Sequence, residues 1–264
     1  MNFSRLYANI FARKFFYKLH RYLFHLSLKG LGVDNYYNSK LSGETYVLKR
    51  FIAKKNCVVF DVGANEGNWS LEVLEKNPTV KIFAFEPSPK TFSVLSSRLS
   101  KYDDVTPYNF GIGSINGKLS LYDYAQENGS RHASLFKDVI VEQHESNQVV
   151  EYLVDMITID DFMKQNDIHF IDFLKVDTEG YEMECLNGAK EAIDNNKIKI
   201  IQFEFNTMHV YSKVFFKDFF DLLSDKYSLY RLIQDGLIPI NKYNPTYHEL
   251  FGFQNILAIN KKYQ

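Results

Sequence analysis

Apolar runs that end in polar residues alternate with amphipathic stretches along most of this chain. Apolar runs of strand length predict buried strands at 57–60, 82–85, 105–110, 170–177 and 198–205. Apolar residues that recur every three or four positions predict helices between these runs, around Val73, at 89–99 and at 186–192. Strands that alternate with helices indicate an α/β fold with a doubly wound, mostly parallel sheet and helices on both faces.

The second half of the chain adds strands of another kind. Residues 118–124 alternate like a strand, and Tyr227–Ile233 with Leu250–Ile259 predict a closing antiparallel pair. Residues 126–147 are polar and irregular, and long irregular stretches inside a compact domain are usually functional or mobile. We therefore expect substrate specificity to lie in 126–147, in 207–216 and in the N-terminal segment.

The first two core strands frame a possible nucleotide site. The first ends in Asp61-Val62-Gly63-Ala64-Asn65-Glu66-Gly67, and the second ends in Glu86-Pro87. The glycines would let the backbone approach a ligand, and the following helix offers free N–H groups at its first turn. A carboxylate at the position of Glu86 can accept both hydroxyls of a ribose. The segment therefore predicts a site for an adenosine-containing cofactor.

Two cofactor classes compete for this site. A dinucleotide site typically has the motif G-x-G-x-x-G, whereas the spacing here is Gly63-x-x-x-Gly67 with Asp61 before the first glycine. That acid would face an anionic pyrophosphate unfavourably, but it suits the ammonium of S-adenosylmethionine. The pattern favours S-adenosylmethionine over the nicotinamide dinucleotide of an oxidoreductase.

Polar residues stand at the ends of five predicted strands, where ligands of open α/β sheets bind: Asp61, Glu86, Asn109, Asp177 and Glu204. We expect Asp61 and the turn from Gly63 through Asn65 to Gly67 to hold the methionine part of the cofactor. Glu86 and Pro87 would adjoin the ribose, and Asn109 the adenine. Asp177 and Glu204 would then face the methyl acceptor.

Three motifs in order carry a family resemblance: Phe60-Asp61-Val62-Gly63-Ala64-Asn65-x-Gly67, Phe85-Glu86-Pro87-Ser88-Pro89 and Leu174-Lys175-Val176-Asp177-Thr178-Glu179-Gly180-Tyr181-Glu182. Together they resemble the FkbM family of S-adenosylmethionine-dependent methyltransferases, over about 43–205. The one departure is Thr178, where the family more often has valine. The resemblance implies the class I methyltransferase fold, with a Rossmann-like seven-stranded sheet. It also implies O-methylation of a hydroxyl on a sugar, glycan or secondary metabolite.

The reaction asks the protein to place a hydroxyl oxygen and to remove its proton. Asp177 is the first candidate for this role, followed by Glu179, Glu204 and Glu182. His132 and His209 are alternative bases. A non-catalytic module that binds the cofactor and has lost turnover is the alternative from another functional class.

A divalent cation is a second option. Metal-dependent O-methyltransferases of the catechol type place an acid after the fourth strand and an acid–asparagine pair after the fifth, and Asp177 with Glu204 and Asn206 is similar to that arrangement. Oxygen ligands of this sort suit Mg²⁺. The alternative is that Glu204 and Asn206 only bond neighbouring loops, and we assign no metal ligand.

The first 40 residues differ from the rest. Residues 1–33 hold six Lys and Arg but no Asp or Glu, and Phe3, Tyr7, Phe11, Phe15 and Leu19 recur every four positions. This pattern predicts a basic amphipathic helix, an extension (1–40) to a methyltransferase domain (41–264). It lacks the ~20 apolar residues of a membrane span and the pattern of a signal peptide. Such a helix either binds a membrane surface or partner, or packs on the domain or a second subunit; we favour packing.

Composition adds little to this picture. The net charge is −1, so no global field attracts nucleic acid, and a sugar or other small molecule is the expected acceptor. The two cysteines lie in a predicted strand and helix, which indicates buried thiols in a reduced, cytoplasmic protein. The basic helix leaves a peripheral membrane location or a homo-oligomer open.

Overall fold

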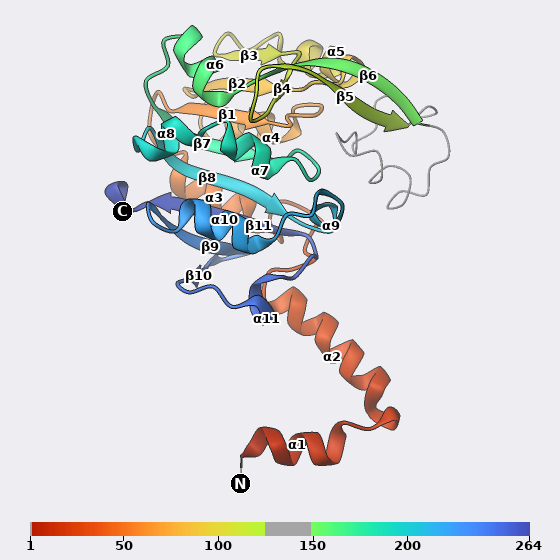
Figure 1. The fold of residues 1–264 in the computed structure, drawn as a ribbon. Coiled ribbons are helices and arrows are strands. Elements are labelled where there is room, and N and C mark those ends of the chain that lie inside the picture. Colours follow the sequence, from red (N-terminus) through yellow and green to blue (C-terminus); the bar gives the residue numbers. More distant parts are fainter. Residues whose placement is uncertain (1, 125–148) are drawn as a thin grey trace.

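The computed structural model describes residues 2–124 and 149–264, and an eight-stranded twisted sheet forms its centre (Figure 1). The strand order is β10-β9-β11-β8-β7-β1-β2-β3. The parallel strands are β1 (Val58–Val62), β2 (Lys81–Phe85), β3 (Val105–Tyr108), β7 (Ile171–Val176) and β8 (Ile198–Phe205). The antiparallel strands are β9 (Tyr227–Ile233), β10 (Gly236–Ile240) and β11 (Gln254–Asn260). The predicted doubly wound sheet and its closing antiparallel pair are confirmed.

The strand count differs from the expected seven because β10 adds an eighth strand at the edge. It pairs with β9 only, from Gly236 opposite Ile233 to Ile240 opposite Leu229. Pro239 lies within it, and an edge strand tolerates proline because its outer side forms no ladder hydrogen bonds. The proline and the short length explain why the hydrophobic pattern did not indicate a strand there.

Helices cover both faces of the sheet and enclose two apolar cores. On one face α3 (Glu44–Phe51), α4 (Asn68–Lys76) and α5 (Pro89–Leu99) pack on side chains such as Val59 and Ile82. On the other face lie α6 (Ile159–Gln165), α7 (Glu182–Asn187), α8 (Lys190–Asp194) and α10 (Phe216–Leu223). Because Phe60, Phe85 and Phe203 alternate with residues of the opposite face, each strand contributes to both cores.

A second, three-stranded sheet stands beside the carboxyl ends of the central strands. It consists of β4 (Gly111–Ile112), β6 (Val149–Ile157) and β5 (Gly117–Tyr124) in that order. Leu121, Val154 and Met156 form its small core together with Tyr181. The predicted specificity segment 126–147 and His132 lie outside the described residues.

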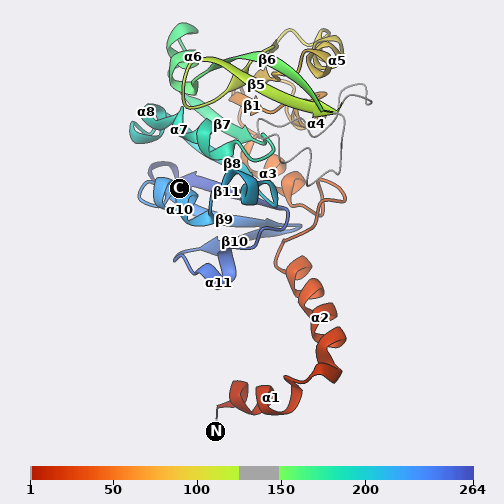
Figure 2. The same cartoon turned by 45° about the vertical axis from the view of Figure 1, so that its right-hand side comes forward.

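Two helices at the N-terminal end project from the domain, as Figures 1 and 2 show from both sides. They are α1 (Phe3–Phe11) and α2 (Tyr17–Gly30), joined by a short 3₁₀ turn at Lys14–Phe16. The sequence predicted one continuous helix here, whereas the structure has two helices with a bend between them. The apolar repeat continues through the bend, so its period could not place the break. Neither helix contains a buried residue, and the favoured packing on the domain of the same chain is not found.

The chain joins the domain directly after α2. Val33 is fully buried, and the Asp34 N–H donates to the Phe253 carbonyl at 2.7 Å. The change from projecting helix to packed chain thus falls near Gly30, ten residues before the predicted boundary at 40. Two short helices, α9 (Met208–Ser212) and α11 (Pro245–His248), lie in the connections after β8 and β10. Among the described residues, none of the helices has the length and apolar character needed to cross a bilayer.

Candidate functional site

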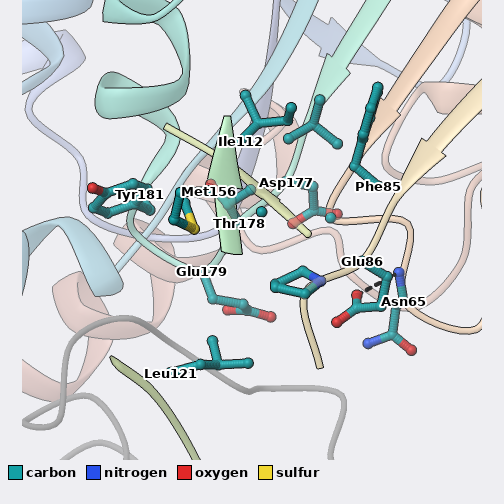
Figure 3. A pocket seen from close by; sticks show the side chains of 14 residues that line it. Asn65, Phe85, Glu86, Ile112, Leu121, Met156, Asp177, Thr178, Glu179 and Tyr181 are labelled. Atoms are coloured by element: carbon teal, nitrogen blue, oxygen red, sulfur yellow. Dashed lines mark hydrogen bonds between the residues drawn. The ribbon is translucent and has the colours of Figure 1, made fainter. Parts of the chain in front are cut away.

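A pocket, here named the strand-end pocket, opens where β1, β2 and β7 end (Figure 3). Its apolar wall consists of Val62, Phe85, Pro87, Ile112, Leu121 and Met156. Its polar wall consists of Asn65, Glu86, Asp177, Thr178, Glu179 and Tyr181, and Gly63 and Gly111 complete the lining. Residues from distant parts of the sequence therefore meet in one cavity with an apolar side and an acidic side.

Glu86 is held rigidly at the pocket wall. Its carboxylate oxygens accept the backbone N–H of Asn65 at 3.0 Å and that of Ser88 at 2.8 Å, and its side chain is only 6% exposed. Asn109 supports this turn from outside, because its Nδ2 donates to the carbonyls of Glu86 and Pro87. The structure thus brings Gly63, Asn65, Glu86 and Pro87 into the pocket, but Asn109 is exposed and does not line it.

Asp61 occupies a different place from the one expected. It is fully buried beneath the pocket and does not line it. One carboxylate oxygen accepts the Ser70 hydroxyl at 2.6 Å, and the other lies 3.8 Å from Lys175 Nζ. Burial raises the pKa of Asp61, and the Lys175 charge opposes that shift. The cation nearest Asp61 is thus the ammonium of the protein's own Lys175.

The two glycines of the turn also serve the fold. A Cβ on Gly63 would lie 1.7 Å from the Asp177 carbonyl oxygen, and Gly63 has φ +78°. A Cβ on Gly67, at φ +81°, would lie 2.8 Å from Leu95 Cδ1. Gly63 therefore permits the close approach of β1 to the end of β7, and Gly67 permits the packing of α4 against α5. Gly67 does not line the pocket.

Sequence reasoning also missed Lys175, whose ammonium pairs with Asp61 and Asp177. It lies on β7, is 5% exposed, and its Nζ is 2.8 Å from Asp177 Oδ2. Burial disfavours the ammonium, but the carboxylates of Asp177, Asp61 and Glu44 outweigh it and raise the pKa of Lys175. The sequence did contain a signal for this role, because Lys175 lies inside a mostly apolar predicted strand. A buried lysine needs an acidic partner nearby.

A second cavity of about 1100 Å³ lies beside the first and is here named the acidic groove. Its lining residues are Asp34, Tyr36, Asp177, Glu179, Glu204, Asn206, Thr207, Met208 and Phe253. The groove shares Asp177 and Glu179 with the strand-end pocket. The three predicted catalytic residues, Asp177, Glu179 and Glu204, are therefore brought together where the cavities meet.

Glu204 lines the acidic groove with a strongly perturbed carboxyl group. Burial, and then the charges of Asp177, Glu179 and Glu182, raise its pKa well above the ordinary value. The Asn206 side-chain amide donates to Glu204, which fixes the direction of the carboxylate. A carboxyl group with a raised pKa is a better proton acceptor than an ordinary one.

The loop that carries Glu179 is shaped by a buried pair behind it. Glu179 has φ +54°, an uncommon backbone conformation for a residue with a side chain. The Glu182 carboxylate accepts the N–H groups of Thr178 and Gly180 at 2.6 and 3.0 Å, and lies 3.0 Å from His209 Nε2. Glu182 and His209 are both fully buried, so neither can contact an acceptor as the predicted alternative base.

The residues considered for Mg²⁺, Asp177, Glu204 and Asn206, all line the acidic groove. Asn206 turns its amide nitrogen to Glu204, and its amide oxygen accepts the Met208 N–H at 2.8 Å. Within 2–124 and 149–264, no group of three or more His, Cys, Asp or Glu side chains is arranged to hold a metal ion. Asn206 thus bonds both Glu204 and the loop after β8.

Comparisons with known proteins show which proteins this chain resembles. The Methyltransferase FkbM domain model matches residues 61–232. The 2-O-methyltransferase NoeI of Sinorhizobium fredii is 23% identical, over 61% of this chain and 68% of its own length. The hexuronic acid methyltransferase AglP of Haloferax volcanii is 26% identical, over 61% of this chain and 63% of its own length. Among solved structures, a precorrin-6y C5,15-methyltransferase of Geobacter metallireducens aligns with a TM-score of 0.43 and 14% identity, over 83% of this chain and 88% of that chain.

Proposed function

Because the chain belongs to the FkbM methyltransferase family, we propose that it transfers the methyl group of S-adenosylmethionine to a hydroxyl of an uncharged sugar. The observation that carries this proposal is the junction of the two cavities at Asp177 and Glu179. The lining of one cavity suits the chemistry of the cofactor, and the lining of the other suits that of the acceptor. The reacting atoms would meet where the cavities join.

The strand-end pocket fits the cofactor in three respects. The Glu86 carboxylate lies at its wall for the ribose hydroxyls, and Phe85, Ile112 and Met156 offer an apolar surface for the adenine. Asp177 and Glu179 favour a cationic ligand, and none of the described lining residues is basic, which disfavours a pyrophosphate. When bound, S-adenosylmethionine supplies a methyl group that its sulfonium already activates.

Glu204 is the proposed general base. Methyl transfer would form a bond from the methyl carbon to the acceptor oxygen and break the bond from that carbon to sulfur, which leaves S-adenosylhomocysteine. The hydroxyl proton must leave to a nearby group. Glu204 lines the acceptor side, its raised pKa suits proton uptake, and Asn206 directs its carboxylate. Asp177, bound to Lys175, would position the acceptor hydroxyl at the junction.

The lining of the acidic groove supports a sugar acceptor. Tyr36 and Phe253 contribute aromatic rings, 6.2 Å apart at their centres, and such rings cover the apolar faces of sugars while carboxylates bond their hydroxyls. Two relatives carry names that refer to 2-O-methylation and to a hexuronic acid. The described groove residues include four acids and no base, so a uronic acid carboxylate would be repelled.

Titration and turnover together test the proposal. Purified protein is titrated with S-adenosylhomocysteine and with NAD, then assayed for methyl transfer to neutral sugars and to uronic acids, with Mg²⁺ or with EDTA. We expect the protein to bind S-adenosylhomocysteine but not NAD, and to methylate neutral sugars but not uronic acids. Preference for NAD would overturn the cofactor assignment, and a preference for uronic acids would overturn the acceptor class. Binding without turnover on any acceptor would favour the non-catalytic module.

A further inference from the structure

For their length, the projecting helices α1 and α2 expose far more large apolar side chains than the rest of the described chain. Half of the exposed large apolar side chains among the described residues lie between Phe3 and Leu26, with Phe3 78% and Phe15 87% exposed. Figures 1 and 2 show α1 at the end of α2 that is farthest from the sheet. An exposed apolar surface of this extent marks an interaction site.

α1 separates its apolar residues from its charge, and α2 has an apolar stripe beside a basic one, with Tyr17 and Phe24 exposed on its other side. On α1, Phe3, Leu6, Tyr7 and Ile10 recur at helical spacing, and Arg5 lies on the opposite side. On α2, Leu19, Tyr22, Leu23 and Leu26 form an apolar stripe, beside a stripe of Lys18, Arg21, His25 and Lys29. The side chains of Tyr7 and His20 are hydrogen-bonded at 2.9 Å, which joins the two helices at their bend.

The charge of the molecule is divided sharply at α2. Residues 1–33 hold six basic and no acidic side chains, so the other residues hold 25 basic and 32 acidic ones, a net charge of −7. Of the six basic side chains, all except Lys29 are exposed. The basic charge therefore concentrates in the part that projects, away from the acidic domain.

We propose that α1 and α2 bind an anionic lipid bilayer surface and hold the domain beside it. Amphipathic helices rich in Lys, Arg and aromatic residues lie in the headgroup region with their apolar faces inserted. Anionic lipids complement the six basic side chains, whereas a second copy of these helices would bring like charges together. The domain alone, with its negative charge, would be repelled by the same surface.

The attachment also orients the acidic groove. Asp34 and Tyr36, which line the groove, follow Gly30 at the end of α2 by four and six residues. The membrane-bound helices would therefore keep the groove close to the bilayer, where a sugar carried on a lipid could enter. This consequence rests on the proposed function, but binding of the bilayer does not.

Sedimentation with vesicles tests the proposal on the full chain. The vesicles contain phosphatidylcholine with or without phosphatidylglycerol, at about 0.1 M and about 1 M salt, where screening shortens from about 10 Å to about 3 Å. The variant Arg5→Gln/Lys18→Gln/Arg21→Gln removes three exposed charges of the helices. The control Lys55→Gln/Lys90→Gln/Lys242→Gln removes three exposed charges of the domain.

We expect wild type to bind the phosphatidylglycerol vesicles, more weakly at high salt, and the helix variant to bind about a hundredfold more weakly. The control should bind like wild type. Leu19→Gln/Leu23→Gln, which keeps the charge and alters no buried residue, should weaken binding at both salt concentrations.

Three results would overturn the proposal. Wild type could fail to sediment with anionic vesicles, or the helix variant could bind as its control does. The chain could instead form a dimer without lipid, and Leu19→Gln/Leu23→Gln could dissociate that dimer. This result would show that the apolar surface of the helices binds a second copy of the chain. Methyl transfer to a soluble sugar is assayed without lipid, so its failure is a separate result.

Discussion

Opposite electrostatic environments distinguish Glu204 from Asp177. Glu204 is surrounded by the acids Asp177, Glu179 and Glu182, and its pKa rises, whereas Asp177 has the Lys175 ammonium at 2.8 Å. Paired titratable groups in contrasting environments often divide acid–base roles between them. Sequence reasoning named both carboxylates from their strand-end positions but could not rank them, because the ranking depends on neighbours contributed by other strands.

If Glu204 accepts the proton, Glu204→Gln should lower kcat by roughly 10²–10⁴-fold and leave the affinity for S-adenosylhomocysteine near that of wild type. The wild-type rate should rise with pH as Glu204 loses its proton. Because the pKa of Glu204 is raised, the increase in rate should occur at a higher pH than it would with an ordinary glutamate as the base.

The pH profile of methyl transfer, with Glu75→Gln as a matched exposed control, checks this prediction. An unchanged kcat in Glu204→Gln would transfer the role of base to Asp177 or Glu179. Those two residues are also within the junction of the cavities.

Lys175 should contribute to stability as well as to the site. Lys175→Met leaves the buried Asp61 carboxylate without its cation, which typically costs about 3–5 kcal/mol of unfolding free energy. The pKa of Asp61 is already raised by burial, and losing the cation raises it further. A raised pKa in the folded state means that stability falls as pH rises, so the loss should be smaller near pH 5 than near pH 8.

Urea unfolding of wild type and Lys175→Met at both pH values measures this difference. The double variant Asp61→Asn/Lys175→Met, which also removes the Asp61 carboxylate, should show less of the pH dependence. The part that remains is expected from buried Glu44, whose pKa burial also raises and Lys175 lowers. An equal loss at both pH values in Lys175→Met would contradict the ion-pair account.

At the scale of elements, the site depends on how closely β1 approaches β7. The turn after β1 and the loop after β7 meet where Gly63 faces the Asp177 carbonyl. From the sequence motif we expected Gly63 to let the backbone approach a ligand, which is the usual reason for a glycine in such a turn. The structure adds a packing reason, because it shows which strand lies next to β1.

Gly63→Ala should therefore separate the two strand ends and weaken the binding of S-adenosylhomocysteine. Its Cβ would fall 1.7 Å from backbone oxygen at φ +78°, so we expect a loss of at least about 3 kcal/mol in unfolding free energy. Gly236→Ala is the matched control, since nothing lies within 4 Å of its Cβ position. Similar melting temperatures and affinities for the two variants would show that the close approach is not required.

For the whole molecule, the decisive feature is the separation of projecting helices from a packed domain. The sequence indicated the basic helical segment and its amphipathic pattern. It could not tell that the segment would bend or leave the domain, because amphipathic helices that pack and those that project share one period. It also placed Asp34 and Tyr36 in the extension, although they line the acidic groove.

Removal of residues 2–30 should leave the domain folded, since no residue of α1 or α2 is buried. The truncated chain should melt within about 2 °C of the full chain and bind S-adenosylhomocysteine equally, because the lost segment contributes almost no core. Removal of residues 2–40 should weaken acceptor use, because Val33 and the groove residues Asp34 and Tyr36 are lost. Scanning calorimetry and KM for the acceptor distinguish the two truncations, and equal behaviour would contradict the boundary near Gly30.

The sequence by itself determined the sheet class, the three motifs, the cofactor class and the acids at the strand ends, because local periodicity and strand-end position are properties of neighbouring residues. Only the tertiary structure decided that Asp61 is paired with Lys175 beneath the pocket, and that Asn109 supports the Glu86 turn from outside. It also placed Glu204 in the acidic groove with Asp34 and Tyr36. These relations depend on which strands are adjacent and on what is excluded from water, and neither is encoded within any single stretch of the chain.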